Sequence, residues 1–250
     1  MSFLELTPQS EGLTIAPLVA LGYCDLCGGG VRALCGLQPK TGETCRQWSV
    51  KVSGLQACSI TTGADGDRTS PGVLQVNTFY DSQGSPIVSI LVLLAAVPSE
   101  NQMLVADAIV SFLEEKVGQD LRLVISAAMR LPETCDSAKP YFATLNGAEI
   151  DGTWETLPAN TRLQDGMIAG LVHLCTARAV KTTLIVVSGH RLSKIADSND
   201  ESHIKVVQTL GEAGAQVLGC HFDKLRLKDL DIVSLSHWND YPHDGIPMYT

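Results

Sequence analysis

Short apolar runs alternate with amphipathic stretches along this chain, and the alternation predicts strands followed by helices. Residues 14–21 (TIAPLVAL) predict an apolar strand, and residues 28–37 (GGGVRALCGL) begin a helix shortly after it. Residues 87–97 (IVSILVLLAAV) are the most apolar run, about half as long as the ~20 residues of a membrane helix. This run therefore predicts a strand buried in the core.

Residues 46–94 predict an antiparallel insertion after the first strand and helix. Residues 47–54, 55–63 and 73–80 have the pattern of strands separated by polar, glycine-rich stretches. The sequence YDSQGS at 80–85 is a turn signal directly before the buried strand, so we expect an antiparallel hairpin there.

The middle of the chain predicts a helix followed by a strand. The S-x-x-Q sequence at 99–102 follows a proline and has the form of a capping box, so a helix should begin at Ser99. Gly118 is placed to end that helix, and residues 121–128 (LRLVISAA) follow as a strand. Residues 130–158 are interrupted by prolines and glycines, which predicts an excursion over the surface.

The last third returns to the strand and helix pattern. Residues 163–179 predict a helix, and residues 182–189 (TTLIVVSG) predict a strand covered on both faces. We expect a further helix at 203–211 and a short strand, AQVLG, at 215–219.

This order predicts an α/β fold with a mostly parallel, Rossmann-like sheet flanked by helices and carrying an antiparallel strand insertion. No repeat or linker divides the chain, so residues 1–235 are expected to form a single domain. Residues 236–250 are expected to form an extended, flexible C-terminal tail.

Composition narrows the classes of partner. The 250 residues carry a net charge of −9, with 45% hydrophobic residues and a mean hydropathy of +0.13. The acidity and the lack of a Lys/Arg cluster disfavour nucleic acid and anionic membranes as partners. The N-terminus has no basic, apolar secretory signal, and the eight cysteines are expected to be reduced thiols, which favours the cytoplasm or the nucleus.

Two motifs suggest chemistry, each with a simpler structural explanation. Cys24 and Cys27 form a C-x-x-C pair that suits a redox pair or half of a zinc site, but a second pair is lacking. Gly28-Gly29-Gly30 could bring amide groups toward a phosphate, and Ser188-Gly189-His190 ends a predicted parallel strand. A small-molecule enzyme of the hydrolase or phosphorylase type, with a cleft between these segments, is therefore one hypothesis. No complete nucleotide, hydrolase or metal motif supports it, so we expect no cofactor, no metal and no catalytic residues.

The chain ends in DGIPMYT, which concentrates anchoring chemistry. Pro247 pushes the preceding residue toward extended geometry, so the final residues should leave the domain as a semi-rigid strand. Met248, Tyr249 and the Thr250 carboxylate then stand side by side. A buried tyrosine ring and a terminal carboxylate are groups that a partner protein can recognise.

The order of elements together with this tail resembles the proteasome assembly chaperone 1 family. The resemblance rests on IAPLVALGY, on the hairpin and helix from VLQVNTFY to VISA, on the unit LQDGMIAGLVHLCTARAVKTTLIVVSGHRL and on the terminal MYT. It covers most of the chain and is diffuse in the middle.

The resemblance implies a non-enzymatic protein that forms a heterodimer with a proteasome assembly chaperone 2-like subunit and helps proteasome α subunits assemble into a ring. In that family a C-terminal hydrophobic-Tyr-X motif docks into a pocket between adjacent α subunits. Met248 would take the hydrophobic position, Tyr249 the tyrosine and Thr250 the terminal residue. Occupancy of the outer α surface would also keep activators away until the particle matures.

Overall fold

The computed structural model describes residues 5–9, 11–25, 28–55, 61–62, 73–95, 97–136, 138–150, 152–189, 201–225 and 230–231. Most of its strands join one nine-stranded sheet, in the spatial order β1-β4-β6-β7-β2-β8-β11-β9-β10. The strands are β1 Leu6–Pro8, β2 Leu18–Gly22, β4 Thr44–Val52, β6 Leu74–Tyr80, β7 Pro86–Leu93, β8 Arg122–Met129, β9 Tyr141–Leu145, β10 Glu155–Thr156 and β11 Lys181–Ser188.

The centre of the sheet is parallel. β2 pairs in parallel with both β7 and β8, and β11 pairs in parallel with β8 along its whole length. β1, β4 and β6 continue the sheet beyond β7 as antiparallel neighbours, and β9 is antiparallel to β11. The predicted α/β fold with an antiparallel insertion is confirmed.

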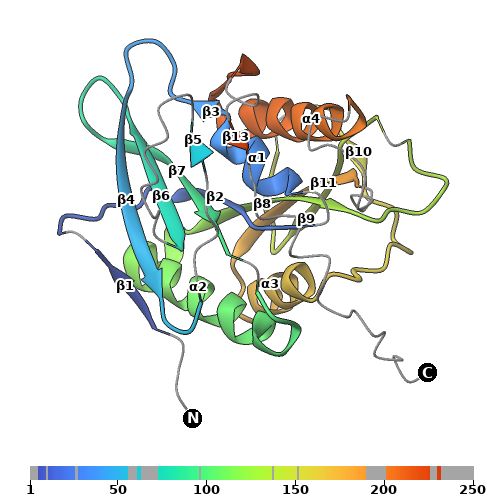
Figure 1. Cartoon of the computed structure of the whole chain (residues 1–250), viewed down its shortest axis with the longest axis horizontal. Coiled ribbons are helices and arrows are strands. Elements are labelled where there is room, and N and C mark those ends of the chain that lie inside the picture. The colour runs from blue at the N-terminus through green and yellow to red at the C-terminus, as the bar shows by residue number, and fades with distance from the viewer. Residues whose placement is uncertain are drawn as a thin grey trace.

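Two helical layers cover the sheet (Figure 1). α1 (Gly29–Cys35) and α4 (Glu201–Leu218) lie on one face, while α2 (Gln102–Val117) and α3 (Gly166–Ala177) lie on the other. Each layer encloses its own hydrophobic core, with Leu34 and Leu210 in the first and Ile109 and Leu171 in the second. Both faces of the central strands are therefore buried, as the apolar run at 182–189 predicted.

Short elements complete the described chain. Two 3₁₀ turns, η1 (Ser99–Asn101) and η2 (Gly118–Asp120), flank α2. β3 (Leu37–Gln38) pairs with β12 (His221–Phe222), and β5 (Thr61–Thr62) pairs with β13 (Leu230–Asp231). Thr61 and Thr62 are the only described strand residues from the expected strand at 55–63.

The start of α2 differs from the predicted capping box. Residues 99–101 form a 3₁₀ turn, and the α-helix begins at Gln102 without a side-chain cap. The Ser99 hydroxyl donates to the Glu100 carboxylate, and the side-chain amide of Gln102 donates to the Val97 carbonyl oxygen. Both side chains of the box are thus directed elsewhere, so helical structure begins at Ser99 as predicted but without the capping hydrogen bonds. The predicted end at Gly118 is confirmed, with φ of 79° at that residue.

α4 is longer than expected, and the strand predicted at 215–219 was wrong. The helix continues to Leu218, and Gly219 follows it with φ of 68°. The prediction failed because Gly211 was taken as a helix end. Gly211 instead lies inside the helix against the Phe222 ring, where a Cβ atom would overlap the aromatic carbons. The glycine is therefore required by packing.

Residues 130–158 contain two strands that the sequence did not predict. β9 pairs with β11 over five residues, and β10 pairs in parallel with the first two residues of β9. The turn after β9 places Asn146 and Gly147 at φ of 56° and 72°, and Ala148 donates to the Leu145 carbonyl. The Asn146 side chain also donates to the carbonyls of Cys175 and Val180, which ties this turn to the end of α3.

Candidate functional site

The carboxyl ends of the central parallel strands are held together by one buried carboxylate, Asp25. Its Oδ1 accepts a hydrogen bond from the Gly29 amide at 2.6 Å, and its Oδ2 accepts from the amides of Gly30 at 2.8 Å and Ala128 at 2.6 Å. Gly29 and Gly30 open α1, and Ala128 lies near the end of β8. One side chain therefore joins the chain after β2 to α1 and β8.

Burial dominates the electrostatics of Asp25. Removal from water raises the pKa of its carboxyl group to about 7, while hydrogen bonds from Ala128, Gly30 and Gly29 act to lower it. The Asp165 carboxylate raises this pKa slightly further. Burial makes the ionised carboxylate of Asp25 unfavourable, and the three amide donors offset part of that cost. Such an environment is found for structural as well as functional carboxylates.

The glycines around Asp25 are explained by close approach of backbones. A Cβ atom on Gly30 would overlap the Ser126 carbonyl oxygen of β8, and one on Gly22 would lie 2.6 Å from the Gly30 carbonyl oxygen. Gly28 precedes α1 with φ of 62°, in the left-handed region that favours glycine. The triple glycine therefore allows α1 to pack directly on β2 and β8.

This arrangement removes the basis for a phosphate site at Gly28–Gly30. The amides of Gly29 and Gly30, which would hold a phosphate, already donate to Asp25. Ser188 and Gly189 lie nearby, because Gly189 donates to the Met129 carbonyl and a Cβ atom there would approach the Ala128 side chain at 2.9 Å. The two segments thus flank the same end of β8, and His190 lies outside the described residues.

Tyr23 and Asp165 extend this buried polar cluster toward the α2 and α3 layer. Burial raises the pKa of the Tyr23 phenol well above its usual value, and the neighbouring carboxylates of Asp165 and Asp25 raise it further. Asp165 also accepts hydrogen bonds from the Met167 and Ile168 amides at 2.8 and 3.1 Å, so it caps α3. Sequence reasoning missed both aspartates, although Asp25 stands just before three glycines and Asp165 just before an apolar helix.

The cysteine pair is only half described. The Cys24 thiol donates to the Leu93 carbonyl oxygen at 3.4 Å, whereas Cys27 lies outside the described residues. Where side chains are described, no group of three or more His, Cys, Asp or Glu residues is placed to hold a metal ion. The zinc and redox hypotheses for this pair stay untested.

The residues predicted to bind a partner also lie outside the described part of the chain. Description ends at Asp231, so Met248, Tyr249 and Thr250 stay a prediction from the sequence and the resemblance. Among the described helices, none combines the length and hydropathy that crossing a membrane requires.

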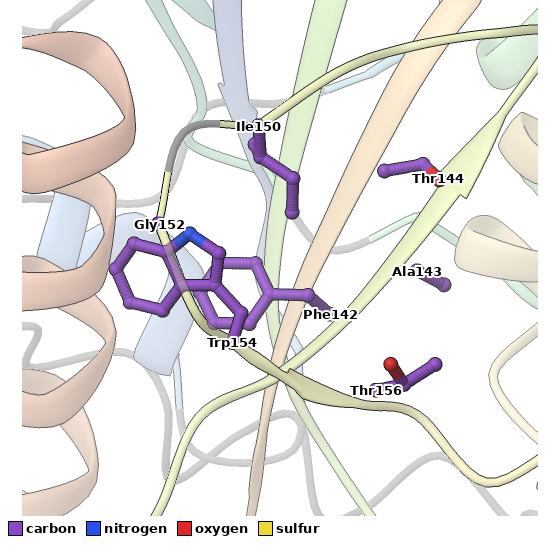
Figure 2. Close-up of a pocket in the computed structure, with 7 residues that line it drawn as sticks. All are labelled: Phe142, Ala143, Thr144, Ile150, Gly152, Trp154 and Thr156. Atoms are coloured by element: carbon purple, nitrogen blue, oxygen red, sulfur yellow. The ribbon is translucent and has the colours of Figure 1, made fainter.

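A hollow of about 190 Å³ lies at the margin of the sheet, beside β9 and β10. Figure 2 shows the Trp154 and Phe142 rings overlapping, with Ile150 beside them; the ring centroids are 4.3 Å apart. Thr144 of β9 and Thr156 of β10 complete much of the wall, together with Ala143 and Gly152. Sequence reasoning missed this hollow because it assigned residues 130–158 to an irregular surface excursion.

Comparisons with known proteins place the fold. No protein-family model matches the sequence, and a comparison with curated proteins found no match. Among solved structures, Pyrococcus furiosus PbaB, described as an archaeal proteasome activator, matches with a TM-score of 0.56 and 12% identity over 91% of this chain and 94% of that chain.

Two further structures match at similar levels. Pyrococcus furiosus PbaA, described as an archaeal homolog of proteasome-assembly chaperone, has a TM-score of 0.54 and 15% identity over 90% of this chain and 86% of that chain. A Thermoplasma acidophilum protein with unknown function has a TM-score of 0.54 and 13% identity over 86% of this chain and 83% of that chain. At such identities the likeness shows the fold alone, so the chain shares the α/β fold of a proteasome activator and a proteasome-assembly chaperone homologue.

Proposed function

We propose that this chain is a non-enzymatic chaperone for assembly of the proteasome core particle. It acts as one subunit of a heterodimer with a proteasome assembly chaperone 2-like protein, in the cytoplasm or nucleus. The heterodimer binds the α-ring surface, and Met248-Tyr249-Thr250 docks into a pocket between α subunits.

The observation that carries this proposal is the shared fold with PbaB and PbaA, which extends over about nine tenths of this chain. The terminal Met-Tyr-Thr adds a second indication, because it has the hydrophobic-Tyr-X form that the resemblance to the assembly chaperone family implies. The amides of Gly29 and Gly30 already donate to Asp25, which supports a protein-binding role over the small-molecule enzyme hypothesis.

The tail is tested by its effect on binding to immature core particles. Tyr249→Ala, and deletion of residues 248–250, should weaken binding of the full-length heterodimer by about 10-fold or more, since buried tyrosines are frequent anchors of interfaces. Tyr241→Ala is the matched control, because it removes the same ring from the same tail outside the motif. Equal affinity of all variants would contradict the docking role.

The heterodimer is tested separately. Coexpression with a proteasome assembly chaperone 2-like subunit should give a 1:1 complex by size-exclusion chromatography with light scattering. A chain that stays uncomplexed under these conditions would contradict the heterodimer, whatever the result with the tail.

A further inference from the structure

β9 is paired along its whole length on one side and over two residues on the other. On its inner side, all five residues from Tyr141 to Leu145 pair with β11. On its outer side, β10 pairs only with Tyr141 and Phe142, and the Leu157 amide donates to the Phe142 carbonyl oxygen at 2.7 Å. The outer side of β9 is therefore closed at its beginning and open toward its end.

The open part presents backbone groups that can pair with another strand. Peptide groups of alternate residues point to the same side of a strand, so Thr144 directs its N–H and C=O outward, as Phe142 does. Within the described part of the chain, no backbone group pairs with Thr144 on this side. Unpaired edges of this kind are templates for addition of a strand.

The hollow lies beside this open edge. Phe142 and Thr144 project from the same face of β9, and the Trp154 ring packs against the Phe142 ring at an interplanar angle of 37° (Figure 2). A strand added outside Thr144 would thus find an aromatic surface for an apolar side chain within reach of its backbone. Backbone pairing and a neighbouring side-chain pocket together are what strand-adding peptides use for affinity and specificity.

Acidic side chains near the outer edge of β9 favour a basic binding partner. Glu149 and Glu155 are exposed on the segment that follows β9. Lys139 is paired with Glu155 at 2.5 Å, and Lys181 is exposed at the start of β11, next to the residue that pairs with Leu145. Residues 133–156 contain five acidic side chains and one lysine. A second copy would bring an equally acidic edge to this one, whereas a basic segment would be attracted.

We propose that the outer edge of β9 binds an extended segment of a partner protein that carries lysine or arginine and places an apolar side chain against Trp154 and Phe142. The segment pairs with the Thr144 backbone and lengthens the sheet. This site is made of other residues than Met248, Tyr249 and Thr250, and it does not depend on the proposed proteasome function.

The probe is a library of synthetic peptides, each about eight residues long as in an ordinary strand, with alternating apolar positions and a Lys or Arg at both ends. A matched library has Glu in place of Lys and Arg. Fluorescence anisotropy with the full-length protein should find basic members that bind at least about 10-fold more tightly than their acidic counterparts.

Two variants locate the binding. Thr144→Pro removes the outward amide and should weaken the best peptide about 10-fold or more, and Glu149→Lys should weaken it several-fold by reversing a charge. Glu115→Lys is the control for charge, since it makes the same change at an exposed position of α2. It should leave binding within about 2-fold.

Amide hydrogen exchange gives a readout that does not require the proline variant to fold. The Thr144 amide of the unsubstituted protein should become protected when the best peptide is bound, because it then donates to the added strand. The proposal is overturned if no basic peptide binds. It is also overturned if Glu149→Lys binds the peptide as tightly as Glu115→Lys and the Thr144 amide stays unprotected.

Discussion

The centre and the margin of the sheet differ in how their backbone N–H and C=O groups are paired. At the carboxyl ends of β2 and β8, three amides that point into the interior donate to Asp25. At the margin, Thr144 of β9 directs its amide and carbonyl away from the sheet, beside a hollow lined by Trp154 and Phe142. In the first region the backbone groups are paired within the chain, whereas in the second the outward groups of Thr144 have no backbone partner among the described residues.

The two regions differ in the kind of ligand that they can accept. The carboxyl ends of parallel strands are the usual ligand position of open α/β sheets. Here the amides that begin α1 already donate to Asp25, and an aromatic hollow lies at the edge beside β9, which is only partly paired on its outer side. The comparison favours protein binding at the margin over small-molecule binding at the centre.

Removal of the central carboxylate should have the largest effect. Asp25→Ala leaves three buried amides without an acceptor, so the free energy of unfolding at about pH 5 should fall by about 3 kcal/mol. Urea unfolding followed by circular dichroism measures this loss. A loss below about 1 kcal/mol would show that water replaces the carboxylate and that the centre is open after all.

Added volume at the centre should also destabilise. Gly30→Ala directs a methyl group into the Ser126 carbonyl oxygen and should lower the free energy of unfolding by about 2 kcal/mol. Gly214→Ala is the matched control, because a Cβ atom there has no neighbour within 4 Å in the middle of α4. It should stabilise by about 0.5 kcal/mol through helix propensity, and equal effects of the two changes would contradict the packing argument.

The stability should depend on pH through Asp25. Burial raises its folded-state pKa from 3.8 to about 7, so the folded protein holds this proton more tightly than the unfolded chain. The contribution is complete below about pH 4 and is lost as pH rises through about 7. Between about pH 5 and pH 7 the free energy of unfolding should fall by about 2 kcal/mol more than that of Asp25→Asn.

Urea titrations of both proteins across this range measure the difference. Asp25→Asn cannot ionise at this position, so it removes the linked proton while keeping one oxygen acceptor. Parallel curves for the two proteins would mean that the three amides hold Asp25 ionised at low pH and outweigh its burial.

The smallest effect is expected at the margin. Thr144→Ala keeps the backbone of β9 and removes only an exposed hydroxyl and methyl group. The free energy of unfolding should therefore stay within about 0.5 kcal/mol of that of the unsubstituted protein. Thermal unfolding measures the difference. A loss of about 2 kcal/mol would mean that this edge is part of the internal structure, and the contrast with the centre would fail.

The sequence predicted much of the sheet, because its central strands are continuous apolar runs and its hairpin has a clear turn signal. The hairpin between β6 and β7 and the buried strand β11 follow directly from these patterns. The capping box failed because Ser99 and Gln102 found other partners, which local sequence does not encode.

The candidate sites were harder to predict. The three amides that converge on Asp25 come from α1 and β8, and the Ala128 amide lies 103 residues from Asp25 in sequence. β9 is five residues long and lies between Pro140 and Gly147, so its alternation is too short to stand out from a loop. The open edge exists only because β10 stops after two residues, which is a property of the fold and not of β9 itself.

The Asn146 side chain gives the margin a mechanical role. Directly after β9, the Asn146 side chain donates hydrogen bonds to the carbonyls of Cys175 and Val180. These bonds connect β9 to the end of α3 in addition to its pairing with β11. Separation of β9 from β11 would therefore also require the loss of the Asn146 hydrogen bonds to these two carbonyls.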